Sequence, residues 1–134
     1  MPVQWTEDLA TGIDQIDAQH RALYQQVSAL HEAMRTSRLD QVPAVVEFLQ
    51  RYALEHFATE EREMAAAAYP GLAEHRRHHQ RFVDEFLRQR ALLDAGITPS
   101  AVVNLSQWLT DWLRDHLRRV DAEMARHLQA ASGR

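Results

Sequence analysis

Apolar residues recur at every third or fourth position along most of the chain, which is the period of amphipathic α-helices. The first stripe predicts a helix from Asp17, its expected N-cap, to about Arg38. One face of this helix carries His20, Leu23, Tyr24, Val27, Leu30 and Met34.

A second stripe predicts a helix capped by Asp40, with Pro43 tolerated in its first turn and an apolar face that extends to Met64. The sequence Tyr69-Pro70-Gly71 then breaks the chain. A third helix follows, and its inward side chains fall within residues 72–86.

Ala95-Gly96 ends the third helix, and Thr98-Pro99 opens a fourth with a cap and a proline at the first helical position. Residues 1–16 are predicted to form an N-terminal arm that packs on the bundle through Trp5, Leu9, Ile13 and Ile16. Four helices with short connections predict an all-α fold: an antiparallel up-down-up-down four-helix bundle over about residues 17–130.

Composition supports a single globular domain over residues 1–134, with 46% hydrophobic residues. A net charge of -4 gives no electrostatic reason to expect nucleic acid, and the absence of cysteine excludes disulfides and thiolate metal sites. The N-terminus lacks the features of a signal peptide, and no apolar run approaches the roughly 18 residues of a membrane span. A cytoplasmic location is the expectation.

Seven ionisable residues interrupt the apolar stripes, although burying such a group without a partner costs several kcal/mol. They are His20, His56, Glu60, His75, His79, His116 and Asp121. His56 and Glu60 lie one helical turn apart, as do His75 and His79. A metal site holding about two ions is one explanation that accounts for all seven residues.

His116 and Asp121 are five residues apart, which corresponds to about 140° around an ideal α-helix. The two side chains can approach the site from either side of the inward line of the helix, or a local π-bulge can bring them together. The sequence leaves both arrangements open.

Other polar residues do not fit the pattern. His31, His78 and His127 are interpreted as surface or rim residues, and Glu61 is expected to be solvated, as is Glu63. Trp108 is interpreted as a packing residue.

Five imidazoles and two carboxylates suit iron, and zinc remains open on ligand type alone. Two six-coordinate ions need about twelve positions. Five histidines, two bridging carboxylates and a bridging oxo or hydroxo group would together fill all but about one of these coordination positions. One open position suits one small ligand, and iron adds reversible redox chemistry with O2.

These residues resemble the hemerythrin family, specifically its single-domain bacterial members, the bacteriohemerythrins. The likeness rests on the segments 12–20, 56–61, 69–70, 75–79 and 112–116, together with Met64 and Asp121. It covers about residues 5–125. The departures are minor: Arg21 and Leu117 stand where the family commonly has Lys and Ile.

The resemblance implies two iron ions: His75, His79 and His116 on one, His20 and His56 on the other. Glu60 and Asp121 would bridge them, and O2 would bind the iron that has two histidines. Leu113 and Leu117 are predicted to line the O2 pocket and to exclude water, with a purely structural core role as the alternative.

Reversible O2 binding for storage, delivery or sensing is the predicted function, and the chain is not expected to be an enzyme. The alternative is a di-iron redox enzyme acting on peroxide, nitric oxide or a small substrate. Ferritin-like enzymes use carboxylate-rich sites, whereas histidines outnumber carboxylates here. A sensor would need a partner with an output domain, no protein acceptor of O2 is identifiable, and two ions make a poor iron store.

Overall fold

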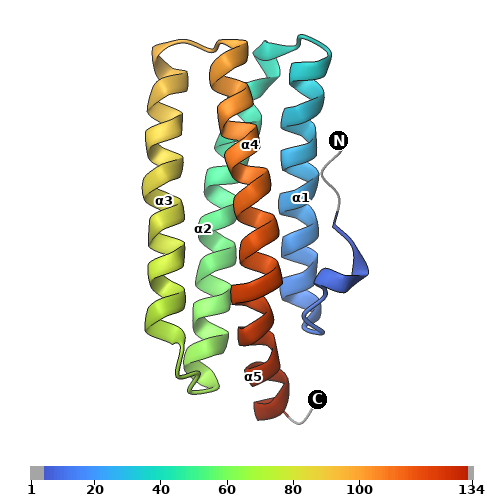
Figure 1. Ribbon diagram of the computed structural model, residues 1–134, viewed down its shortest axis with the longest axis vertical. Helices are drawn as coiled ribbons and strands as arrows, with labels where there is room; N and C mark the ends of the chain where they lie inside the picture. The colour runs from blue at the N-terminus through green and yellow to red at the C-terminus, as the bar shows by residue number, and fades with distance from the viewer. Residues whose placement is uncertain (1–4, 133–134) are drawn as a thin grey trace.

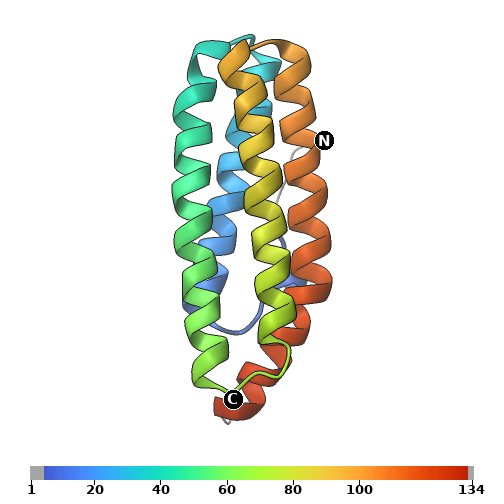
Figure 2. The same cartoon turned by 90° about the vertical axis from the view of Figure 1, so that its left-hand side faces the viewer.

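The computed structural model describes residues 5–132 and shows an antiparallel four-helix bundle in up-down-up-down order (Figure 1). Its long helices are α1 (Asp14–Arg35), α2 (Val42–Ala66), α3 (Leu72–Ala95) and α4 (Pro99–Asp115). The fourth helix continues through a π-helical segment, η3 (His116–Asp121), into α5 (Ala122–Ser132). Figure 2 shows α3 in front of α1, with α2 and α4 on either side, so that the four helices enclose one central core. Within the described residues, no helix is both long and apolar enough to cross a bilayer.

The first helix begins four residues earlier than the sequence predicts, because its N-cap is Ile13 and not Asp17. Asp17 lies inside the first turn, where its carboxylate accepts hydrogen bonds from the backbone N–H and hydroxyl of Thr11, both at 2.8 Å, and from the N–H of Gly12 at 3.2 Å. The carboxylate therefore fixes the preceding loop instead of capping the helix, because the loop folds back over it. Residues 1–4 of the predicted arm lie outside the described residues.

The second helix also begins differently from the prediction. Asp40 lies in a short 3-10 turn (Leu39–Gln41), and α2 begins at Val42 with Pro43 in its first turn and no side-chain cap. The predicted cap of the fourth helix is confirmed, since the hydroxyl of Thr98 accepts a hydrogen bond from the N–H of Ala101 at 3.1 Å.

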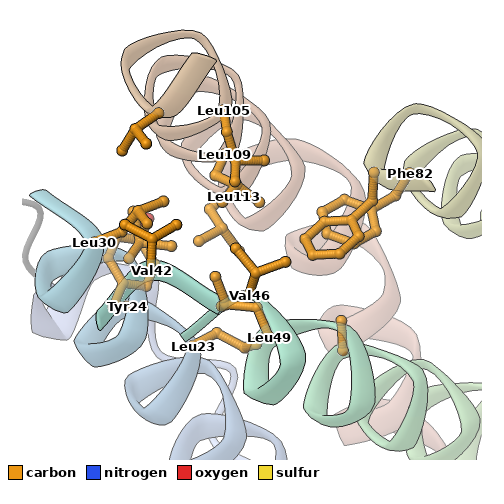
Figure 3. Close-up of a cluster of buried hydrophobic side chains, with 14 of the residues drawn as sticks. Leu23, Tyr24, Leu30, Val42, Val46, Leu49, Phe82, Leu105, Leu109 and Leu113 are labelled. Atoms are coloured by element: carbon orange, nitrogen blue, oxygen red, sulfur yellow. The ribbon is translucent and has the colours of Figure 1, made fainter. Parts of the chain in front are cut away.

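Two apolar clusters divide the interior of the bundle. The larger one fills the half of the bundle nearest the α1–α2 and α3–α4 connections. Four of its residues come from the four helices and converge there: Leu23, Leu49, Phe82 and Leu109 (Figure 3). The smaller one closes the opposite end. It consists of Ile13, Ile16, Met64, Met124 and Leu128.

The described part of the arm packs along the side of α1, but the arm is shorter than predicted because residues 14–16, including Ile16, belong to the helix. Leu9 joins the larger cluster and Ile13 the smaller one, while Trp5 is partly buried beneath the guanidinium of Arg21, 4.3 Å from the ring centroid. The layer between the two clusters is polar and is formed by the seven ionisable residues.

Candidate metal centre

All four helices of the bundle contribute to this polar layer, the fourth through its π-helical continuation. His20 comes from α1, His56 and Glu60 from α2, His75 and His79 from α3, and His116 and Asp121 from η3. None of the seven residues is more than 4% exposed. The structure thus brings together every residue that the sequence nominates as a ligand.

Glu60 lies between two groups of histidines. Its Oε2 is 3.3 Å from His20 Nε2 and 3.2 Å from His56 Nε2. Its Oε1 is 3.4 Å from His75 Nε2 and 3.0 Å from His79 Nε2. One carboxylate oxygen therefore faces each group.

Asp121 repeats this arrangement from the opposite helix. Its Oδ2 is 3.1 Å from His20 Nε2, whereas its Oδ1 is 3.1 Å from His75 Nε2 and 2.9 Å from His116 Nε2. Two donor sets result: His20 and His56 on one side and the other three histidines on the other, with a carboxylate oxygen from Glu60 and from Asp121 facing each.

The π-helical segment explains how His116 and Asp121 reach the same centre. An i→i+5 turn places residues five apart on one face of the helix, whereas an α-turn would place them about 140° apart. The structure thereby decides between the two arrangements that the sequence left open, in favour of the π-helix. Val120, which the α-helical period places inward, is only half-buried for the same reason.

Glu60, Asp121, His20 and His75 hold one another in charged forms, as the shifts of their pKa values show. Burial opposes ionisation of Glu60, but His56, His20 and His75 hold its pKa well below the usual value. Burial would likewise lower the pKa of His20 and His75, yet Asp121 and Glu60 raise the pKa of each to about 9. For His56, burial outweighs its acidic neighbours and lowers the pKa.

Several atoms of the centre lie close together within residues 5–132 but make no hydrogen bond of good geometry. They are the Nε2 atoms of His20, His75 and His116, Glu60 Oε2 and both oxygens of Asp121. Buried polar atoms are normally hydrogen-bonded, so a set of unpartnered lone-pair donors that converge on one region needs another explanation. Imidazole nitrogens and carboxylate oxygens are ligands that iron and zinc accept, and the donor set therefore fits a metal.

Two histidines of the centre also make a hydrogen bond through Nδ1, on the side of the ring away from the centre. Their partners are residues that the sequence analysis did not identify. His56 Nδ1 lies 2.7 Å from Gln19 Oε1, and the amide nitrogen of Gln19 donates to Thr59 Oγ1 at 3.1 Å. His79 Nδ1 lies 2.9 Å from Glu61 Oε2. The expectation that Glu61 is simply solvated is wrong, because α2 and α3 pack closely enough for its carboxylate to reach across.

No sequence signal pairs these residues. Gln19 and His56 are 37 positions apart, and Glu61 is 18 positions from His79. Only the packing of α1 and α3 against α2 makes them neighbours.

The other three histidines are not among the residues that converge on the centre, although the ring of His78 lies at its edge, 6.0 Å from that of His116. His31 is bonded to Thr110 at 3.2 Å, His127 contacts the carbonyl of Ala67 at 2.9 Å, and His78 lies 3.7 Å from Glu74 on the flank of α3. In residues 5–132, the clusters that could hold a metal contain only residues of the predicted seven.

Apolar and aromatic side chains line the centre on the side of the larger cluster. Phe57 stacks on His79 with centroids 3.9 Å apart, and Trp112 stacks on His116 at 4.2 Å. Leu113 lines an apolar cavity of only about 10 Å³, at the lower limit for one water molecule. Leu117 is buried in the same cluster. This side of the centre is therefore apolar and closely packed.

An antiparallel four-helix bundle with a buried histidine-rich and carboxylate-containing centre defines a class, the metal-binding four-helix-bundle proteins. The model of the Hemerythrin HHE cation binding domain matches residues 11–128. The chain belongs to the hemerythrin family.

Named relatives agree with this assignment. The chain is 35% identical over 126 residues to the bacteriohemerythrin of Stenotrophomonas maltophilia, which covers 94% of this chain and 81% of that protein. It is 34% identical over 118 residues to the bacteriohemerythrin of Pseudomonas aeruginosa, covering 88% and 76% respectively. It is 30% identical over 120 residues to the myohemerythrin of Riftia pachyptila, covering 90% of this chain and 88% of that protein.

Proposed function

We propose that this protein binds O2 reversibly at a non-haem di-iron centre. His75, His79 and His116 would hold one iron, and His20 and His56 the other. Glu60 and Asp121 would bridge the two, together with an oxo or hydroxo group. Two such irons supply the two electrons that reversible O2 binding requires, for storage, delivery or sensing.

One observation carries this proposal: both buried carboxylates direct one oxygen to each of two separate histidine groups. A single ion would need only one of the two histidine groups and one oxygen of each carboxylate, whereas two ions side by side would use both groups and both oxygens. The count of donors also supports it, because three histidines on one side and two on the other leave the second ion with a free position.

The protein's own task is to keep that free position dry and apolar. Leu113 and Leu117, both at most 4% exposed, lie one turn apart on the segment that leads into the centre. We propose that they line the O2 pocket. Their bulk would exclude water and proton donors, so that bound O2 leaves unchanged.

The test is an optical titration of purified, iron-loaded protein. Metal analysis should find about two irons per chain, and the anaerobically reduced protein should gain a charge-transfer band with O2 that degassing removes. One iron per chain, or zinc after iron-replete expression, would overturn the di-iron assignment. Rapid irreversible oxidation, or turnover of added peroxide or nitric oxide, would favour a redox enzyme instead.

A further inference from the structure

We propose that Glu61 is a positioning residue of the metal centre: it fixes the tautomer and orientation of His79 and strengthens that ligand as a donor. This inference rests on the proposed di-iron centre and concerns a residue outside the seven that would bind the ions.

The two ring nitrogens of His79 face two different carboxylates. Nε2 lies 3.0 Å from Glu60 Oε1, inside the centre, and Nδ1 lies 2.9 Å from Glu61 Oε2, at its edge. A metal ligand needs a free lone pair on Nε2, which requires the proton to be on Nδ1. The carboxylate of Glu61 accepts that proton in a charge-assisted hydrogen bond, so it favours the ligating tautomer.

The stacking of His79 on Phe57 cannot perform this function. Their rings are 3.9 Å apart at 12°, which fixes the plane of the imidazole. A flip of the ring by a half-turn, or a change of tautomer, would leave that stacking unchanged. With a metal on Nε2, Glu60 would itself be a ligand, so Glu61 is the acceptor that remains for the Nδ1 proton.

Glu61 is itself held in place by α3. Arg76 Nε lies 3.2 Å from Glu61 Oε1, so the two oxygens of one carboxylate contact Arg76 and His79 respectively. The Glu61 side chain is 28% exposed and that of Arg76 57%, so this ion pair contributes little net stability on its own. Its consequence is geometric, because Arg76 aims the carboxylate at His79.

The other four histidines lack such a charged partner among residues 5–132. His56 Nδ1 contacts the neutral amide of Gln19, and the Nδ1 atoms of His20, His75 and His116 have no partner. A carboxylate behind an imidazole raises its basicity as a ligand. Glu61 would therefore make His79 the strongest donor of the five histidines and would favour the ferric state of an iron bound there.

The experiment compares Glu61→Ala and Glu61→Gln with Glu63→Gln, a matched control at an exposed glutamate two residues along α2. In the metal-free protein, ¹⁵N NMR should show a proton on Nδ1 of His79, and Glu61→Ala should shift that proton towards Nε2, which faces Glu60. Affinity for Fe(II), measured anaerobically by chelator competition, should fall about 10- to 100-fold in Glu61→Ala. Glu61→Gln should keep most of the affinity and raise the reduction potential of the iron centre.

The control should match the wild type in all three measurements. If wild-type protein loads two irons and the Glu61 variants match Glu63→Gln in tautomer, affinity and potential, this inference fails and the proposed function stands. If wild-type protein loads no iron, the proposed function itself fails. Should Glu61→Ala not fold, the tautomer and potential of the isosteric Glu61→Gln decide.

Discussion

His116 Nε2 and Asp121 Oδ1 lie 2.9 Å apart, although their spacing of five residues would place them on different faces of an α-helix. The π-helical turn between them accommodates the extra residue and returns the chain to α-helical geometry at Ala122. Because π-turns are rare and occur often at functional sites, this turn links the geometry of the backbone directly to the metal centre.

Deletion of the exposed Arg119 tests this link. The deletion leaves His116 and Asp121 four residues apart, a spacing at which an ordinary α-turn places both on one face. We expect the variant to keep its iron and its helical circular dichroism. Insertion of one alanine after Arg119 should instead cost the iron, because neither an α-turn nor a π-turn aligns residues six apart. Iron loss in the deletion variant would show that the π-geometry itself is required.

Replacing one ligand should release metal, whereas replacing the remaining histidines should not. His56→Ala removes a buried donor and leaves Glu60 Oε2 with one fewer neighbour, so iron content should fall and the bundle should lose stability. His31→Ala, His78→Ala and His127→Ala should each retain the iron content and optical spectrum of the wild type. Metal analysis of the four variants checks this, and iron loss in any of the last three would contradict the assignment of ligands.

Polar substitution of the proposed O2 pocket should shorten the lifetime of bound O2. Leu113→Asn and Leu117→Asn would admit water or a proton donor beside the free iron position, so autoxidation should increase several-fold with unchanged iron content. Alanine variants of the two leucines cannot distinguish an O2 pocket from a purely structural role. The cavity they create lowers stability by about 2–5 kcal/mol whether or not O2 binds there. Wild-type autoxidation rates in both asparagine variants would assign these leucines to the core alone.

The metal-free protein should lose stability between about pH 6.5 and pH 9. His20 and His75 have a pKa of about 9 in the fold against the ordinary histidine value of 6.5, so the folded state holds their protons more tightly. Their contribution is complete below pH 6.5 and is lost as the pH rises through 9. Urea unfolding in the presence of a chelator measures this decline.

The iron-loaded protein provides the comparison, because metal binding requires neutral imidazoles and is favoured by rising pH. The extra stability conferred by iron should therefore grow over the same interval. Metal-free stability that increases from pH 6.5 to pH 9 would contradict the proposed pairing of these histidines with Glu60 and Asp121.

The sequence by itself determined the helical period, the number of helices and the seven residues of the centre. Its apolar stripes specify which face of each helix is buried, and a histidine or carboxylate within such a stripe is conspicuous because burial without a partner is costly. Contacts between residues close in the sequence could also be predicted. Thr98 is the example, since its cap contact reaches only to Ala101.

Only the tertiary structure decided contacts that join distant segments or depend on a departure from the regular helical period. Asp17 fixes a loop instead of capping α1 because the preceding chain folds over it, and Glu61 becomes the partner of His79 because α3 packs beside α2. The π-turn at His116 has the same origin. A regular α-helix is the local preference of the chain, and packing four helices around one polar centre is what overrides it.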